Sequence, residues 1–347
     1  MCFAPIPPAC HRAWGGPLGA ARIRVAVEDF QVLEVPLVEP CGEGEHSWLR
    51  VRKRSSNTPW VAQQLARFAG VAPAAVSYAG LKDRHAVTEQ WFSVHLPGRG
   101  DPDWSALQDA DFSVLSAQRH LRKLKIGALR GNWFTLRIRD LNIDPDVMEQ
   151  RLELLRRGGF PNYFGVQRFG RDGANLRAAA QLFQQPKRRV NRSKRGIYLS
   201  AVRSALFNRV LSARVASGSW NRALPGDALQ LDGKSACFVA DALDAETLAR
   251  VDALQIHPTG PLYGEGEPLC RDVARALEAE QWSGLEDWLD GLRRARLAAA
   301  RRALRVVPGS LQGHEESSGV WVLAFYLPAG SYATSLLDEL IRVVPSP

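Results

Sequence analysis

The amino-acid sequence predicts a mixed α/β (α+β) fold in which a helix-rich block interrupts one domain. Segments in which apolar and polar residues alternate, as they do in β-strands, lie near both ends of the chain. Segments with the apolar spacing of helices dominate between them. At 347 residues the chain is also long enough for two domains. The two end segments are therefore expected to form one domain, with an insertion between them.

The strands near the N-terminus come first. Residues 1–21 are rich in Pro, Gly and Ala and are expected to form a flexible arm. An extended segment at 22–27 leads to an alternating strand at 29–35. Alternation also predicts strands at 46–53 and 131–139, and one that ends at residue 96. A helix is expected at 58–70, because Thr58 suits its N-cap, Pro59 suits its first turn and Gly70 suits its end. A second helix is expected at 144–157.

Helical patterns dominate the second half. The spacing predicts helices at 175–183, 197–216, 245–254 and 285–304, with short strands at 228–231 and 237–240. A strand is expected at 319–327 and a final helix at 336–343. The helix at 285–304 carries five arginines and is a candidate for phosphate contacts.

Composition bounds the function. The chain has 46% apolar residues and a net charge of +9, so it is a globular protein whose basic excess favours a polyanion such as nucleic acid. None of the five cysteines lies in a C-x-x-C pair, which argues against a zinc site and a disulfide framework. We expect no signal peptide and no membrane-spanning segment, because the N-terminus has no long apolar stretch and no run of about 18 apolar residues exists.

A charged loop precedes the strand that ends at residue 96. It holds Lys82, Asp83, Arg84 and His85. Nearby cations favour the ionised form of a carboxylate, and an ionised Asp on a loop held by a strand is a reasonable nucleophile or base. The same residues also fit a solvated turn with no chemical role.

Two other stretches are candidates for nucleic-acid contacts. Residues 161–170 interleave aromatics and glycines with Arg168, which fits either a packed hinge or an RNA contact. Residues 187–195 hold six cations and no acid, which fits either a solvated face or phosphate binding. No nucleotide-binding or metalloprotease motif is present, and the seven histidines are scattered. A carboxylate, a cation and aromatic packing suit a reaction at a sugar carbon.

Residues 79–90, Ala-Gly-Leu-Lys-Asp-Arg-His-Ala-Val-Thr-Glu-Gln, resemble the catalytic motif of the TruD family of tRNA pseudouridine synthases. Further stretches that match the family in the same order are 28–30, 131–136, 161–170, 201–208 and 327–331. Together they span the chain from about residue 22 to residue 341. Several long motifs in one order are more specific than a single short pattern.

The resemblance implies a two-lobed protein. A pseudouridine synthase catalytic domain with a mixed sheet would comprise 22–157 and 307–347, and a helix-rich, TruD-specific α/β domain would be inserted at 158–306. The implied reaction is an isomerisation of uridine 13 in certain tRNAs: the N-glycosidic bond is cut, the base turns, and a carbon–carbon bond forms. The resemblance implies tRNA as partner and neither a cofactor nor a metal, and we expect a cytoplasmic monomer.

The resemblance also implies roles for single residues. Asp83 matches the catalytic aspartate, which acts as nucleophile or base, and Arg24 matches a basic position that pairs with it. Phe134 would stack on a base flipped out of the RNA. The other expected active-site positions are Phe30, Asn132, Lys82, Gln90 and Tyr332, the last of which stands where the family usually has Phe. RNA contacts are expected from Arg168, Lys187, Arg188, Arg189, Arg192, Lys194 and Arg195.

Two alternatives stay open. The chain could be an RNA-binding module without catalysis, although an intact Asp83 with Asn132 and Phe134 argues against that. It could also be a different RNA-processing enzyme, such as a nuclease or a glycosylase, which would leave a cleaved chain or a free base.

Overall fold

Strands from both ends of the chain share one sheet in the structure, a computed structural model that describes residues 10–107, 109–185, 189–240 and 242–344. The chain forms two compact units. The sheet unit comprises the described residues of Pro17–Arg156, Pro308–Gly330 and Leu340–Pro347, and the helical unit comprises those of Met1–Gly16, Arg157–Val307 and Ser331–Glu339. The expected division into catalytic and inserted domains stays a prediction about function.

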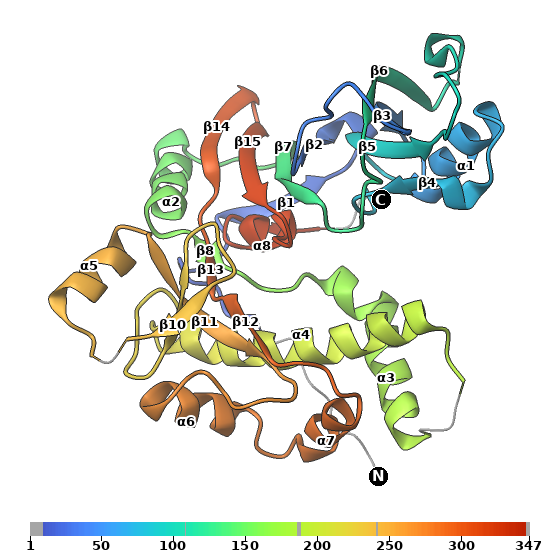
Figure 1. Ribbon diagram of the computed structural model, residues 1–347. Helices are drawn as coiled ribbons and strands as arrows, with labels where there is room; N and C mark the ends of the chain where they lie inside the picture. Colours follow the sequence, from blue (N-terminus) through green and yellow to red (C-terminus); the bar gives the residue numbers. More distant parts are fainter. Residues whose placement is uncertain (1–9, 108, 186–188, 241, 345–347) are drawn as a thin grey trace. The chain divides into compact units, whose positions relative to one another are not determined.

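The sheet unit contains a mixed sheet of ten strands within the described ranges, which confirms the predicted fold class. Its central order is β14-β15-β7-β2-β5-β3-β6, with β2 parallel to β5 and the other neighbours antiparallel. The strands are β1 Gly19–Ile23, β2 Phe30–Pro36, β3 His46–Arg54, β4 Val76–Tyr78, β5 Val87–His95, β6 Phe112–His120, β7 Leu129–Arg139, β14 Gly309–Ser317, β15 Val320–Pro328 and β16 Ile341–Val343. Figure 1 labels most of them.

Helices and short 3-10 turns complete this unit. The helices are α1 Thr58–Phe68 and α2 Pro145–Gly158, and the 3-10 turns are Val27–Asp29, Pro73–Ala75 and Trp104–Ala106. The apolar face of α1 packs Val61 and Leu65 against Phe92 of β5 and Leu49 of β3, and all four side chains are buried. Both helices were expected, but the N-cap of α1 is Asn57, and Thr58 uses its hydroxyl elsewhere, as described below.

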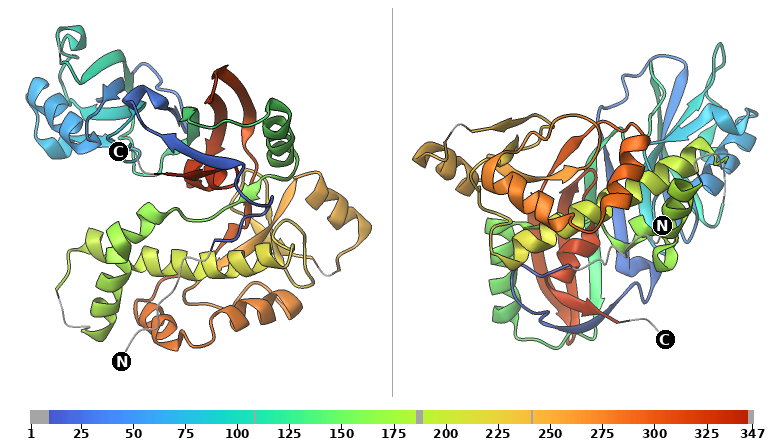
Figure 2. Two further views of the ribbon diagram at one scale, coloured as in Figure 1. Left: turned by 180° about the vertical axis from the view of Figure 1, so that it is seen from behind. Right: turned by 90° about the horizontal axis from the view of Figure 1, so that it is seen from below.

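The N-terminal segment differs from the flexible arm expected at 1–21, because residues 19–23 form strand β1. Strand β1 pairs in parallel with β16 and antiparallel with β7, so the first and last strands lie side by side (Figure 2). The expected final helix at 336–343 is wrong in its second half, because α8 ends at Asp338 and residues 341–343 form β16. Helical spacing in a short apolar segment does not exclude a strand, and here the pairing with β1 decides.

The helical unit is built around α4, which runs from Arg192 to Ala216 and contacts α3, α6, α7 and β11 (Figure 1). Its apolar face buries Leu199, Val202, Leu206 and Phe207. The helices of the unit are α3 Ala174–Gln184, α4 Arg192–Ala216, α5 Ala245–Asp252, α6 Asp272–Gln281, α7 Glu286–Arg294 and α8 Ala333–Asp338, and the 3-10 turns are Val166–Phe169 and Arg171–Gly173. The strands are β8 Phe160–Pro161, β9 Ala228–Leu231, β10 Cys237–Val239, β11 Ile256–Leu262, β12 Ala300–Ala303 and β13 Arg305–Val306.

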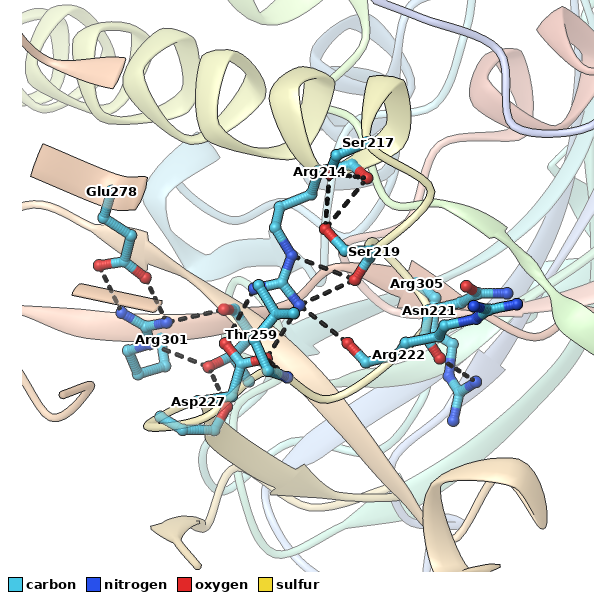
Figure 3. Close-up of polar contacts among 12 residues, drawn as sticks. Arg214, Ser217, Ser219, Asn221, Arg222, Asp227, Thr259, Glu278, Arg301 and Arg305 are labelled. Carbon is cyan, nitrogen blue, oxygen red and sulfur yellow. Dashed lines mark hydrogen bonds and ion pairs between the residues drawn. The ribbon is translucent and has the colours of Figure 1, made fainter. Parts of the chain in front are cut away.

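Buried arginines connect helices of this unit to its sheet (Figure 3). Arg214 of α4 makes two hydrogen bonds of 2.9 and 2.8 Å to Asp227, and both side chains are almost fully buried. Arg301 donates to both carboxylate oxygens of Glu278 and to the main-chain oxygen of Thr259. Burial lowers the pKa of Arg301, but its bonds to Glu278 outweigh that effect and raise the pKa above its usual value.

The expected helix at 285–304 is therefore wrong beyond residue 294. Arg296 has φ 54°, the main chain of residues 297 and 299 bonds with Glu265, and residues 300–303 become strand β12 beside β11. Arg301 and Arg302 lie inside the unit instead of on a phosphate-binding face, and the guanidinium carbon of Arg302 lies 4.1 Å from the ring centre of Phe164. Among the described cysteines, Cys10, Cys41, Cys237 and Cys270 are free. No helix within the described ranges is long and apolar enough to cross a membrane.

Candidate functional site

Asp83 lies on the loop between β4 and β5, as the sequence predicts. Its side chain is 46% exposed, and its Oδ2 accepts a hydrogen bond of 2.6 Å from Nη2 of Arg24. Within the described ranges Oδ1 accepts no hydrogen bond from the protein. One carboxylate oxygen is therefore fixed by a cation, while the other is free to meet a substrate.

Arg24 reaches Asp83 from a strained backbone position. Its φ is 59°, which is uncommon for a residue with a side chain, and it lies between β1 and the turn Val27–Asp29. The guanidinium carbon is 4.0 Å from the ring centre of Phe30, a cation–π contact. Phe30 meets Phe134 edge to face at 6.2 Å, and Phe134 stacks on Phe325 at 5.3 Å. The Arg24–Asp83 pair thus lies beside a packed aromatic cluster from β2, β7 and β15.

Lys82 fastens the loop to the sheet. Its Nζ lies 2.6 Å from Oδ1 of Asn132 and 2.7 Å from Oε2 of Glu34. Glu34 of β2 and Asn132 of β7 face each other directly in the strand register, so the ammonium bridges two neighbouring strands. The Lys82 side chain is 8% exposed and that of Glu34 1%, so this pair is buried, whereas Asp83, Arg84 and His85 of the same loop are exposed.

Gln90 and Thr58 hold the loop on its other side. The Thr58 hydroxyl donates to Oε1 of Gln90 at 2.7 Å and accepts from the main-chain N–H of Lys82 at 3.1 Å. Nε2 of Gln90 donates to the main-chain oxygen of Gly80. Gln90 is fully buried on β5, so it supports the loop from within the sheet.

Two charged residues of this site are not among those predicted from the sequence: Glu34 and Lys53. Lys53 is fully buried, and its Nζ donates at 2.8 Å to the main-chain oxygens of Ser56 and Asp83. Burial lowers the pKa of Lys53 to about 8, although the Asp83 charge raises it. The sequence indicates that both are buried. Alternation places Glu34 on the apolar face of Phe30 and Val32, and Lys53 on the apolar face of Leu49 and Val51.

Tyr332 and Arg168 belong to the helical unit, whereas the expected site residues named above belong to the sheet unit. The Tyr332 hydroxyl accepts a hydrogen bond of 3.0 Å from Nε of Arg168. Its ring meets Phe164 edge to face at 6.0 Å and touches the space beside Gly165, where a Cβ atom would lie 2.9 Å from it. The structure therefore brings these two predicted residues together in one cluster.

The basic run is only partly described. Lys187 and Arg188 lie outside the described residues. Arg189, Arg192 and Lys194 are exposed, and Arg195 is half-buried. Arg192, Lys194 and Arg195 stand in the first turn of α4, which Asn191 caps through a bond to the main-chain N–H of Ser193.

No group of three or more His, Cys, Asp or Glu side chains within the described ranges is placed to hold a metal ion. The chemistry that the site offers is that of a half-exposed carboxylate, a guanidinium and aromatic rings. The carboxylate can act as a nucleophile or as a base at a carbon atom of a bound ligand.

Comparison with known proteins supports the resemblance. The family model described as "tRNA pseudouridine synthase D (TruD)" matches residues 14–182 and 174–340. The tRNA pseudouridine synthase D of Methylococcus capsulatus is 49% identical over 334 residues, covering 96% of this chain and 94% of that protein. That of Nitrosococcus oceani is 47% identical, covering 95% and 93%.

A solved structure shares the fold. The crystal structure of a protein from Methanosarcina mazei, assigned as a tRNA pseudouridine synthase D, matches with a TM-score of 0.72, 22% identity and 99% coverage of each chain. With the long sequence matches, these findings show that the chain belongs to the tRNA pseudouridine synthase D (TruD) family.

Proposed function

We propose that this chain isomerises uridine to pseudouridine in tRNA, and that its target is uridine 13. The family and the names of its relatives support the reaction and the class of RNA. The observation that carries the proposal is the Arg24–Asp83 pair, in which a half-exposed carboxylate with one unbonded oxygen lies beside buried aromatic rings. The reaction is a rearrangement within one nucleoside, so it consumes no second substrate.

Asp83 is the residue that carries the chemistry in this proposal. Its free Oδ1 either attacks the sugar carbon that holds the base or removes a proton from the sugar, and the N-glycosidic bond breaks. The released base turns, and its ring carbon bonds to the same sugar carbon. In the first case this bond displaces the Asp83 carboxylate, and in the second the sugar regains the proton that Asp83 removed. The ring carbon then loses its own proton, and the ring nitrogen that left the sugar gains one. Arg24 orients the carboxylate through the hydrogen bond from its Nη2 to Oδ2 of Asp83.

The neighbouring residues have supporting roles in the proposal. Phe134 and Phe30 provide an apolar wall for a base flipped out of the RNA, while Lys82, Asn132 and Gln90 keep the loop in place. The proposed role of Tyr332 is also an aromatic contact with the substrate. Arg168 and the basic run from Lys187 to Arg195 bind phosphates; the exposure of Arg189, Arg192 and Lys194 supports this for those three residues.

The test is an incubation of the purified chain with unmodified tRNA, followed by pseudouridine mapping at every uridine. The proposal expects pseudouridine at position 13, with intact RNA and no free uracil. Pseudouridine at another position would overturn the assignment of the target but not the reaction. Cleaved RNA or free base would favour the alternative of a nuclease or a glycosylase, and binding without any product would favour an inactive RNA-binding protein.

A further inference from the structure

Lys53 of β3 is a fully buried lysine whose acceptors are main-chain carbonyls. Its Nζ donates at 2.8 Å to the main-chain oxygen of Ser56 and at 2.8 Å to that of Asp83. Neither acceptor carries a full charge. The ammonium group thus contacts the main chain of Asp83, the residue on which the proposed reaction depends.

A lysine at this position needs a reason, because burying an ammonium group without a paired carboxylate is unfavourable. Leu49 and Val51 precede it on the same face of β3 and are fully buried. A methionine would fill similar space without a charge. The unfavourable burial of the Lys53 charge therefore suggests that the charge has a function at the Asp83 loop.

We propose that Lys53 is a positioning residue, which in its protonated form holds the main-chain carbonyl of Asp83 and so sets the carboxylate in its reactive place. This inference rests on the proposed role of Asp83. It goes further, because it assigns the active protonation state of a residue that does not touch the substrate.

The anchoring of the loop supports this role. Thr58 and Gln90 hold the residues before Asp83, and Lys82 ties the loop to the sheet. Asp83 itself is held at two points: its Oδ2 by Arg24 and its main-chain oxygen by Lys53. If the second bond weakens, the main chain of Asp83 can shift while the rest of the loop stays anchored. A shift of about 1 Å at a reacting group costs about 100-fold in rate.

The charges around Lys53 set its protonation. Burial lowers its pKa to about 8, the Asp83 carboxylate raises the pKa, and Lys82 lowers it. The residues opposite Lys53 in the sheet are Thr88 of β5 and Phe112 of β6, neither of which titrates in this range.

Other charged groups on the adjoining elements are already engaged. Glu89 of β5 binds Arg50 and Arg52. The Arg54 side chain pairs with Glu28, and the main-chain N–H of Arg54 bonds to the main-chain oxygen of Asp111 ahead of β6. Arg84 of the loop donates to the main-chain oxygen of Ser55. Asp83 and Lys82 are therefore the charges that tune Lys53.

Activity and the contribution of Lys53 to stability should consequently change in opposite directions above pH 8. Turnover falls as Lys53 loses its proton, because a neutral amine is a weaker donor to the Asp83 carbonyl. The contribution of Lys53 to the free energy of unfolding, measured as the difference between wild type and Lys53→Met, rises between about pH 8 and 10.5. The folded pKa of Lys53 lies below the unfolded value, so the unfolded chain binds the additional proton in that window. A residue that only supported the fold would not lose activity as stability rises.

The first measurement needs no variant at Lys53. The chain contains seven lysines, so ¹³Cε-labelled lysine gives few NMR signals, and the Lys53 signal can be followed from pH 6 to 10.5. We expect it to titrate near pH 8 and to coincide with the alkaline fall of the single-turnover rate. A rate that stays constant through the titration of Lys53 would overturn the inference.

Variants test the same point. Lys53→Met should lower the single-turnover rate by about 10- to 100-fold, keep the Kd for tRNA within about twofold, and lose the alkaline fall near pH 8. Lys123→Met is the control for the loss of a lysine: the exposed Lys123 also donates to a main-chain oxygen of this unit, that of Ala74. A Lys53→Met rate close to that of wild type would contradict the proposal. If that variant does not fold, the NMR titration and the wild-type pH profile still decide.

The inference can be separated from the proposed function. In Asp83→Asn the pKa of Lys53 should fall further, because the carboxylate that raises it is gone. An unchanged pKa would refute the coupling between the two residues, whether or not pseudouridine is made. If wild type makes no pseudouridine at all, the proposed function fails, and with it the role of Lys53 in that reaction.

Discussion

Asp83→Asn is the most informative substitution, because it should separate activity from stability. The change keeps the shape of the side chain and removes its charge. The ion pair that it breaks is partly exposed on both sides, with 26% of the Arg24 side chain and 46% of the Asp83 side chain accessible. Exposed pairs contribute about 0.2–1 kcal/mol, so the free energy of unfolding should change by about 1 kcal/mol at most.

Activity should fall far more. An amide cannot act as the nucleophile or base that the reaction needs, so the single-turnover rate should drop at least about 1,000-fold, or roughly 4 kcal/mol in activation free energy. Binding of tRNA should persist or tighten, because phosphate contacts elsewhere supply most of the affinity and one negative charge is gone. The measurements are pseudouridine formation, a tRNA titration and urea unfolding on the same preparation.

Asp140→Asn is the matched control. Asp140 also pairs with an arginine, Arg22, at the edge of the same unit, and both side chains are similarly exposed. Asn tolerates the positive φ of 62° at that position. The control should retain normal turnover. Wild-type levels of pseudouridine from Asp83→Asn, or an equal loss in both variants, would refute the assignment of Asp83.

Three further outcomes are expected. Tyr332→Phe should keep turnover within a few-fold, since it loses one hydrogen bond from Arg168 and keeps its ring. Tyr332→Ala should lower turnover by about tenfold or more. A loss of turnover in the Phe variant as deep as that of Asp83→Asn would show that the hydroxyl takes part in the chemistry. Arg192→Glu with Lys194→Glu should weaken tRNA binding and flatten its salt dependence, by about 0.7–0.9 log units per log unit of salt for each phosphate that is no longer neutralised; an unchanged slope would remove this turn of α4 from the interface. Asp227→Asn should lower the free energy of unfolding by about 3 kcal/mol or more in urea denaturation, because it leaves the Arg214 charge buried and unpaired.

The exposed pair between Asp290 and Arg293 is the control for the last of these changes. Asp290→Asn breaks an ion pair of the same unit on its surface, where water can solvate the arginine instead. It should leave the urea midpoint nearly unchanged. A loss as large as that of Asp227→Asn would mean that burial of the Arg214 pair is not the cause.

Local patterns predicted much of the fold and the core of the site. Alternation located β2, β3, β7 and β15, and Pro59 and Gly70 located α1 although its N-cap is Asn57 and not Thr58. The charged loop before β5 and its Asp83 were also predictable, because a run of titratable residues between an apolar approach and a strand is visible in the sequence. The sequence patterns do not predict strands β6, β11 and β14 or helix α6, and they place β12 at the end of a helix, because pairing partners far away in the chain decide such segments.

The sequence by itself determined the mixed α/β class, the family resemblance and the residue types of the candidate site. Only the tertiary structure decided how the charges are used. It buries Lys82 against Glu34 and Asn132, places Lys53 beneath Asp83, and turns Arg301 inward to Glu278. The physical reason is that the state of a charged side chain depends on its burial and its partners. Both come from strands and helices distant in the sequence, so no local pattern contains them.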